Sequence, residues 1–284
     1  MNATKRVLKI ISKRPQYMTI TDLTFSQVDS WFKHCRRDLR MNIMYPQYTQ
    51  GKKYPCIAWI CGGGWQQVDK SAHNLYLSRL AAEGFVVASV EYRTSNEGKY
   101  PAQIQDVKVA IRYLRAYAER FNIDEEKIGV MGESAGGYLT CMAALDNASG
   151  LDVGEHLEKS SRVQAACAWY PPTDLTAFPH NSSEECAASA ESLLLGFNIM
   201  KHSQKAIECS PISKITKEAP PILIIHGNKD SVVPYSQSEK FYEKLKEEEC
   251  DVTFLTLDGA DHADVQFFQD ETWDEIIQFF KEKL

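Results

Sequence analysis

The sequence has no long hydrophobic run: no stretch of about 18 consecutive apolar residues occurs in it, and a helix that spans a membrane needs at least that length. Basic residues near the N-terminus surround an apolar stretch that is too short and too interrupted for a signal peptide. We therefore expect a cytoplasmic chain without a membrane-spanning helix. Internal repeats and low-complexity linkers are also missing, which excludes collagen, coiled coil and disorder as the main architecture.

An excess of basic residues is missing as well. The 32 Lys and Arg residues are outnumbered by 38 Asp and Glu residues, so the formal net charge is -6. Nucleic acids and anionic membranes bind clustered Lys and Arg, so we expect neither as a partner. No basic cluster points to a phosphorylated substrate.

The eight cysteines form no C-x-x-C pair and no metal-ligand spacing. Several of them lie in apolar runs, where a free cysteine behaves as a small hydrophobic residue. We therefore expect mostly reduced, buried thiols and no metal site.

From about residue 54, short apolar runs alternate with longer amphipathic segments. Continuous β-branched runs are typical of strands that are buried on both faces, as in a parallel sheet. The expected strands are 55–60, 85–90, 128–131, 163–169, 222–226 and 252–257, and the expected helices include 101–120, 236–248 and 271–283. This order predicts a single α/β domain over residues 1–284, with a mostly parallel central sheet flanked by helices.

Three segments do not follow this alternation of strands and helices. Residues 1–35 are expected to form an N-terminal extension, and the alternating pattern of residues 38–44 predicts antiparallel edge strands. Residues 178–212 separate two predicted strands with polar sequence and a helical patch. We expect this insertion to form a small helical cap over the strand ends, the alternative being a helix packed beside the sheet.

The clearest motif is Gly-Glu-Ser-Ala-Gly-Gly at residues 132–137. It follows the predicted strand at 128–131 and precedes an apolar helix, which is the context of a nucleophile elbow. The two outer glycines of G-x-S-x-G allow the strand and the helix to approach closely. The motif predicts that Ser134 is a nucleophile.

A serine nucleophile needs a base, and in this architecture the base comes last in the chain. Only His226 and His262 lie late enough in the sequence. His226 ends a predicted strand, whereas His262 lies in a loop between the last strand and the last helix. Ligands meet at such loops in open α/β sheets, so His262 is the preferred base.

The base in turn needs an orienting acid. Asp230 follows the strand at 222–226, in a loop that ends at Pro234. Asp174, which follows the preceding strand, is its competitor, and Asp261 is adjacent to His262 and expected to face elsewhere. Asp230 is therefore the predicted third member of the triad, the alternative being a turn or helix-capping carboxylate.

The segment Cys-Gly-Gly-Gly-Trp at residues 61–65 follows the first strong central strand. Acyl transfer develops an oxyanion that needs preorganised N–H donors, and consecutive glycines let the backbone approach a substrate. We expect the N–H groups of Gly63, Gly64 and Ala135 to form the oxyanion hole, with Trp65 as an alternative donor. The other interpretation of the glycine run is a loose turn.

Together these residues resemble the α/β-hydrolase superfamily, and within it the lipase and esterase branch with an HGGGW loop and a G-[DE]-S-A-G-G elbow. That branch includes acetyl esterases, feruloyl-esterase-like proteins and relatives of hormone-sensitive lipase. The similarity extends over about residues 36–283 and includes VEYR at 90–93 and YPAQIQD at 100–106. One residue departs from the pattern: Cys61 stands where the family usually has histidine. A reactive-thiol role for Cys61 would need a depressed pKa.

The resemblance implies a serine carboxylic-ester hydrolase that forms an acyl-enzyme on Ser134, without metal or cofactor. Short-chain acyl, acetyl or feruloyl-type esters, including carbohydrate-linked ones, fit it best. An amide hydrolase of the same fold, such as an arylformamidase or a small serine peptidase, and a non-catalytic binding protein are the alternatives. Nothing in the sequence bears on the oligomeric state. Four aromatic residues near the motifs are expected either to wall the substrate pocket or to belong to the core: Trp65, Tyr138, Trp169 and Tyr170.

Overall fold

A single eight-stranded sheet runs through the computed structural model, which describes residues 3–11, 14–30, 34–47 and 49–284. The strand order is β1-β2-β4-β3-β5-β6-β7-β8. The pairs β1/β2 and β2/β4 are antiparallel, and every other neighbouring pair is parallel. The strands are β1 (Gln16–Asp29), β2 (Arg36–Gln47), β3 (Tyr54–Ile60), β4 (Val86–Val90), β5 (Ile123–Glu133), β6 (Ala165–Trp169), β7 (Ile222–Gly227) and β8 (Val252–Leu257).

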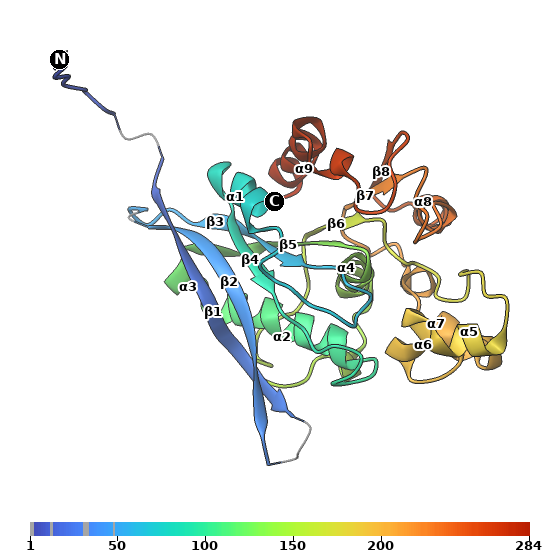
Figure 1. Ribbon diagram of the computed structural model, residues 1–284. Coiled ribbons are helices and arrows are strands. Elements are labelled where there is room, and N and C mark those ends of the chain that lie inside the picture. Colours follow the sequence, from blue (N-terminus) through green and yellow to red (C-terminus); the bar gives the residue numbers. More distant parts are fainter. Residues whose placement is uncertain (1–2, 12–13, 31–33, 48) are drawn as a thin grey trace.

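Helices cover both faces of this sheet (Figure 1). Residues of α1 and α9 pack in one core cluster, and residues of α2, α4 and α8 pack in the other. The helices are α1 (Asn74–Ala82), α2 (Ala102–Ala116), α3 (Ala118–Phe121), α4 (Ala135–Leu145), α5 (Ser183–Ala188), α6 (Ala190–Leu195), α7 (Ser203–Glu208), α8 (Ser236–Glu247) and α9 (Asp270–Lys283). The 3-10 turns are η1 (Ser149–Leu151), η2 (Ile199–Lys201), η3 (Pro211–Lys214) and η4 (Val265–Phe268).

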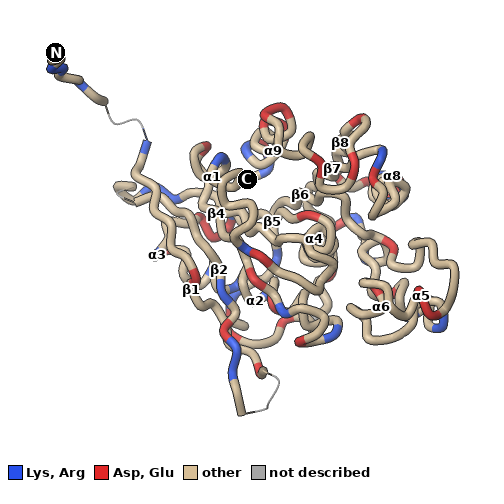
Figure 2. The backbone as a smooth tube through the Cα atoms, in the orientation of Figure 1, with Lys and Arg blue, Asp and Glu red and all other residues tan. Residues whose placement is uncertain are grey.

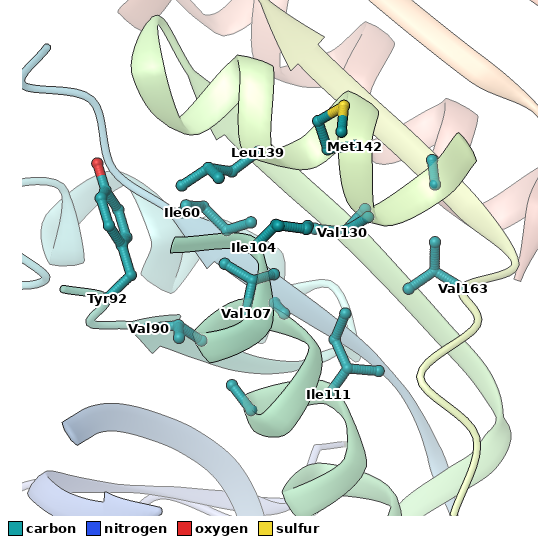
Figure 3. Packing of buried hydrophobic residues seen from close by; sticks show 14 of the residues in the cluster. Ile60, Val90, Tyr92, Ile104, Val107, Ile111, Val130, Leu139, Met142 and Val163 are labelled. Carbon is teal, nitrogen blue, oxygen red and sulfur yellow. The ribbon is translucent and has the colours of Figure 1, made fainter. Parts of the chain in front are cut away.

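Strand alternation divides the core between the two faces. In β3, Ala58 and Ile60 belong to the cluster beneath α2 and α4, whereas Ile57 and Trp59 belong to the cluster beneath α1 and α9. Figure 3 shows the first cluster, in which Ile60 and Val130 of the sheet meet side chains of α2 and α4. Successive side chains of a strand point to opposite faces, so strands that are apolar at every position must be covered on both sides. The predicted mostly parallel sheet flanked by helices is confirmed.

The N-terminal prediction is wrong in part. Residues 16–29 form β1, which pairs along its length with β2 at the edge of the sheet, so the extension does not reach residue 35. The strand escaped detection because only Phe25 and Ser26 in it are buried, and its apolar pattern is correspondingly weak. Residues 3–11 are exposed and form no helix or strand. Of the expected extension, residues 1–2, 12–13 and 31–33 lie outside the described residues.

The edge strands predicted at 38–44 are confirmed in β2, which is antiparallel to both of its neighbours. The insertion at 178–212 contains α5, α6, η2 and α7, and the helices α5, α6 and α7 lie together in Figure 1. Two hydrogen bonds join the end of α6 to the loop before α2: Tyr100 N donates to Leu194 O at 2.9 Å, and Lys99 Nζ donates to Leu193 O at 2.8 Å. Among the described residues, no helix combines the length and the hydropathy of a membrane span.

Candidate active site

Ser134 lies at the sharp turn between β5 and α4, with φ 51° and ψ -121°. A non-glycine residue with positive φ is uncommon, and such strained positions cluster at active sites. The turn is held from both sides, because Ser134 N donates to Trp169 O at 2.9 Å and Tyr138 N donates to Ser134 O at 2.9 Å. The predicted elbow therefore has the strand-turn-helix geometry that exposes the serine hydroxyl.

The close packing of this turn depends on glycine. A Cβ atom on Gly136 would lie 2.0 Å from the carbonyl oxygen of Ile60, at the end of β3. On Gly132 it would lie 2.6 Å from the same oxygen. No side chain fits at either position, so backbone touches backbone where the nucleophile turn meets the strand that leads to the glycine loop.

His262 joins the serine to a carboxylate. Its Nε2 lies 3.1 Å from Ser134 Oγ, and its Nδ1 lies 2.8 Å from Asp230 Oδ2. Because the carboxylate only accepts hydrogen bonds, Nδ1 carries the hydrogen and Nε2 is free to accept the serine proton. The structure thus brings together the three residues predicted for the triad.

Asp230 is held as a charged acceptor. Its side chain is fully buried, and its Oδ1 accepts from the backbone N–H groups of Val232 and Val233 at 2.9 and 2.8 Å. Burial on its own raises the pKa of Asp230, but hydrogen bonds from His226 and His262 outweigh it and hold the pKa well below its usual range. An ionised carboxylate therefore faces Nδ1 of His262.

His226, the rejected candidate for the base, contacts the same carboxylate. Its Nε2 lies 3.2 Å from Asp230 Oδ2 and 3.1 Å from Val233 O, and its Nδ1 lies 2.7 Å from Ser238 Oγ. Nε2 faces two acceptors, so it must carry a hydrogen. Asp230 Oδ2 is therefore bound by two histidines, one of which faces the nucleophile while the other lies wholly buried behind it.

The competing acids have local roles. Asp174 Oδ1 accepts from the backbone N–H and the hydroxyl of Thr176 at 2.9 and 2.6 Å. Asp261 Oδ1 accepts from the backbone N–H groups of Ser231 and His262 at 2.8 and 2.7 Å. Both carboxylates stabilise turns, and neither is paired with the imidazole of His262.

The glycine loop after β3 turns sharply and faces the serine. Gly63 and Gly64 have φ values of 117° and 58°, and Gln66 N and Gln67 N both donate to Gly63 O, at 3.0 and 3.1 Å. Within the described residues, the N–H groups of Gly63, Gly64 and Ala135 donate to no other group. All three residues line one cavity with Ser134. Unpaired donors beside a nucleophile are what an oxyanion hole requires.

Glu133, adjacent to the nucleophile, is the centre of a buried polar network. Its Oε1 lies 2.8 Å from His73 Nε2 and 3.4 Å from Gly62 N, and its Oε2 accepts from the Tyr170 hydroxyl at 2.5 Å. Burial raises the pKa of Glu133, but the hydrogen bond from His73 and then that from Tyr170 bring it below its ordinary value. The Tyr170 ring in turn packs against His262, with ring centroids 4.4 Å apart.

The cavity beside Ser134 has a volume of about 380 Å³. It lies within the range of small-molecule sites. Trp65 and Tyr170 line it, as expected for a substrate pocket. Tyr138 and Trp169 do not: both are fully buried, and Tyr138 donates to Cys209 O at 2.8 Å. For these two residues the substrate-binding prediction is wrong, and they are core aromatics. The insertion contributes Phe178, Ala190 and Glu191 to the cavity wall.

Cys61 does not have the environment of a reactive thiol. It is buried beneath the loop, and burial raises the pKa of its thiol to about 12. Its carbonyl oxygen accepts from the Tyr92 hydroxyl at 3.0 Å. A catalytic cysteine needs a lowered pKa, so Cys61 acts as part of the core. All eight cysteines are free thiols, and most are buried. Among the described residues, no three His, Cys, Asp or Glu side chains are grouped as they would be to hold a metal ion.

Sequence reasoning missed the supporting residues. Glu133 was visible within the elbow motif and His226 at the end of its strand, but only the fold shows that both touch the predicted site. His73 lies 60 positions before Glu133 and carries no local motif. Glu191 lies in the predicted cap, where only its placement in an insertion distinguished it.

Comparison with known proteins agrees with this geometry. The BD-FAE family profile matches residues 41–245. Esterase LipC of Mycobacterium tuberculosis is 34% identical over 218 residues, which cover 75% of this chain and 53% of LipC. The chain thus spans about half the length of the curated relatives it matches.

Two solved structures are similar over nearly the whole chain. A truncated carbohydrate esterase from gut microbiota has a TM-score of 0.81 and 29% identity, with 95% of this chain and 99% of that chain covered. A bifunctional GH43-CE protein of Bacteroides eggerthii has a TM-score of 0.82 and 30% identity, with 93% and 38% covered. The expected α/β-hydrolase fold is confirmed.

Proposed function

This chain belongs to the BD-FAE family, and we propose that it is a serine carboxylic-ester hydrolase that forms an acyl-enzyme on Ser134. The observation that carries the proposal is the position of His262, whose two ring nitrogens lie 3.1 Å from Ser134 Oγ and 2.8 Å from Asp230 Oδ2. That arrangement activates a hydroxyl that is otherwise a weak nucleophile.

In the first half-reaction, Ser134 Oγ attacks the ester carbonyl while His262 Nε2 takes the hydroxyl proton. Asp230 holds the imidazole with Nδ1 protonated and stabilises the imidazolium that forms. The negative charge that develops on the carbonyl oxygen is received by the N–H groups of Gly63, Gly64 and Ala135. Each such donor contributes about 3 kcal/mol to transition-state stabilisation.

The first half-reaction ends when this tetrahedral intermediate collapses: the ester C–O bond breaks, His262 gives its proton to the leaving alcohol, and the acyl group stays on Ser134. In the second half-reaction water enters and attacks the acyl carbon, His262 takes its proton, and the resulting oxyanion occupies the same N–H groups. Collapse of that intermediate releases the carboxylic acid and returns the proton to Ser134.

The proposed substrates are small esters with short acyl, acetyl or feruloyl-type groups, including carbohydrate-linked esters. A cavity of about 380 Å³ supports a small acyl group. The name of one similar structure, a carbohydrate esterase from gut microbiota, supports the carbohydrate-linked class. The segment 178–212, which supplies part of the cavity wall, is proposed to act as the cap of this site.

A substrate panel tests the proposal. Purified protein would be assayed with 4-nitrophenyl acetate, methyl ferulate, N-formylkynurenine and an aminoacyl anilide, and labelled with a fluorophosphonate. We expect ester turnover and labelling of Ser134, both lost in Ser134→Ala, with kcat lower by at least about 10⁴-fold. Ser78→Ala, at an exposed position of α1, is the matched control. Full turnover by Ser134→Ala would contradict the mechanism, and a higher kcat/KM for either amide would make the protein an amide hydrolase.

A further inference from the structure

We propose that Glu191 is a substrate-binding residue of this cavity and accepts a hydrogen bond from a hydroxyl group of the ester. The inference rests on the proposed function and names the chemical class of its substrate: an ester that carries a hydroxyl group beside the scissile bond. That hydroxyl can come from a sugar on the alcohol side or from a phenol on the acyl side.

Glu191 is an unusual residue for the place it occupies. It lies in the first turn of α6 and lines the cavity that contains Ser134 and His262. Only 8% of the residue is exposed. Within the described part of the chain its carboxylate has no hydrogen bond and no ion pair, and its oxygens are not among the side-chain atoms that are sealed from water. The carboxylate is therefore hydrated when the cavity holds no ligand. A ligand that displaces this water must supply hydrogen bonds, because removing a carboxylate from water costs several kcal/mol unless hydrogen bonds compensate.

The main chain that carries Glu191 is held at both ends of α6. A Cβ atom on Gly64 would lie 3.7 Å from Ala190 Cβ, so the residue before Glu191 lies against the oxyanion loop. Ser189 Oγ caps α6 by accepting from Ser192 N at 3.2 Å, and Lys99 and Tyr100 donate to carbonyl oxygens at the far end of the helix. The backbone of Glu191 is therefore preorganised at the cavity wall, and only its side chain has to adjust to a ligand.

The remaining cavity wall shows which ligand the carboxylate suits. Glu133, Tyr170 and His262, the other ionisable groups that line the cavity, are already hydrogen-bonded within the network and the triad. Trp65, Phe178 and Val232 add apolar surface. An ionised carboxylate accepts hydrogen bonds and repels anions. A neutral ester with a hydroxyl group satisfies it, whereas a plain alkyl ester leaves it unpaired.

The test compares substrates that differ in their donors. The substrates are an O-acetylated methyl xyloside (hydroxyls on the alcohol side), methyl ferulate (phenol on the acyl side) with its O-methylated analogue, and 4-nitrophenyl acetate (no donor). For Glu191→Leu we expect kcat/KM to fall about 10- to 100-fold on one or both hydroxyl-bearing substrates. On 4-nitrophenyl acetate and the O-methylated analogue, which offer the carboxylate no donor, kcat/KM should not fall. A loss on the xyloside places the recognised hydroxyl on the alcohol side of the ester, and a loss on methyl ferulate places it on the acyl side.

Two further variants distinguish a substrate-binding role of Glu191 from a purely structural one. Glu191→Gln keeps a weaker acceptor, so its loss should be smaller than that of Glu191→Leu. Glu184→Leu, at an exposed position of α5 in the same segment, should change nothing. Because the carboxylate of Glu191 has no hydrogen-bond or ion-pair partner among the described residues, Glu191→Leu should unfold at about the same temperature as wild type. Lower selective activity together with unchanged stability is not expected of a merely structural residue.

The inference is overturned if all substrates lose activity equally, if none does, or if the selective loss is confined to a cationic ester such as acetylthiocholine. Binding of the xyloside and of methyl ferulate to Ser134→Ala, with and without Glu191→Leu, measures the same contact without turnover. If wild type hydrolyses no ester, the proposed function fails, and binding that depends on Glu191 would still support the subsite. Binding of both ligands that does not depend on Glu191 would refute it.

Discussion

At the scale of single residues, the site depends on the environment that the fold gives to ordinary side chains. Asp230 stays ionised because two histidines and two backbone N–H groups stabilise its charge although it is buried. A carboxyl group whose pKa is lowered on folding stabilises the native state above its unfolded pKa of about 3.9, and that contribution is lost as the pH falls through the folded pKa. The triad is therefore also a source of acid-sensitive stability.

We expect His226 to position Asp230 rather than to exchange protons with substrate. His226→Leu removes the donor that lies 3.2 Å from Asp230 Oδ2, so kcat should fall about 10-fold with KM unchanged, since hydrogen bonds to charged groups contribute about 1.5–3 kcal/mol. His226→Gln keeps an N–H donor and should recover part of the loss. Initial rates over a range of 4-nitrophenyl acetate concentrations, with thermal unfolding of each variant, measure both effects. A raised KM with normal kcat, or no recovery in His226→Gln, would contradict the positioning role.

At the scale of elements, Glu133 forms hydrogen bonds with three segments that meet at the carboxyl ends of the parallel strands. It ends β5 and binds His73 before α1, Tyr170 after β6 and the loop after β3. Because Tyr170 packs on His262, one carboxylate supports both the glycine loop after β3 and His262. Networks of this kind are stable only when every member is satisfied.

Glu133→Gln tests this linkage. The amide cannot accept from His73 and Tyr170 as strongly as the carboxylate does, so the free energy of unfolding at pH 7 should fall by about 1–3 kcal/mol. The pKa of Glu133 is lowered in the fold, so the difference from wild type should be full above the unfolded pKa of about 4.3 and shrink below it. Urea unfolding at pH 7 and pH 4 measures this, with Glu126→Gln at an exposed position of β5 as control. An equal difference at both pH values would show that the charge of Glu133 does not matter.

Elements with a clear local pattern can be predicted from the sequence, whereas contacts between distant segments cannot. Strands such as β7, buried at every position, read as continuous apolar runs, and Ser134, Asp230 and His262 each lie beside a strand end with a recognisable local pattern. β1 was missed because half-exposed edge strands bury few residues. The partners of Glu133 lie 60 and 37 positions away from it, and no local pattern records such contacts. For Tyr138 and Trp169 the sequence left the pocket wall and the core as alternatives for the same reason, since closeness in the chain says nothing about which face a ring occupies.

At the scale of the whole molecule, the antiparallel pair β1/β2 closes one edge of the sheet. Ser26 Oγ of β1 donates to Glu155 Oε2 at 2.7 Å, and Phe25 packs against Tyr113 of α2. The exposed face of this pair also carries charge, within a chain in which acidic and basic residues are interspersed (Figure 2). The other side is apolar: in β2, Leu39, Met41 and Ile43 are fully buried. Without β1, this apolar strand would become an unpaired edge, and such edges promote aggregation.

Two truncations separate the tail from the strand. Removal of residues 1–15, whose described members lie outside the sheet, should leave esterase activity and the unfolding temperature unchanged. Removal of residues 1–35 deletes β1 and should produce aggregation or an unfolding temperature lower by about 5 °C or more, since about 1 kcal/mol shifts the midpoint by 2–4 °C in a domain of this size. Size-exclusion chromatography and thermal unfolding measure both. A stable, monodisperse product of the longer truncation would contradict a structural role for β1.

The contact between Gly136 and Ile60 has a consequence for how the sequence can change. The spacing between the nucleophile turn and β3 is set there by the radii of main-chain atoms, since even a methyl group has no room. Side chains elsewhere in the core can be exchanged for others of similar volume without altering that spacing. The alignment of the nucleophile turn with the glycine loop is therefore expected to tolerate exchanges in the core and to be lost on any substitution of Gly132 or Gly136.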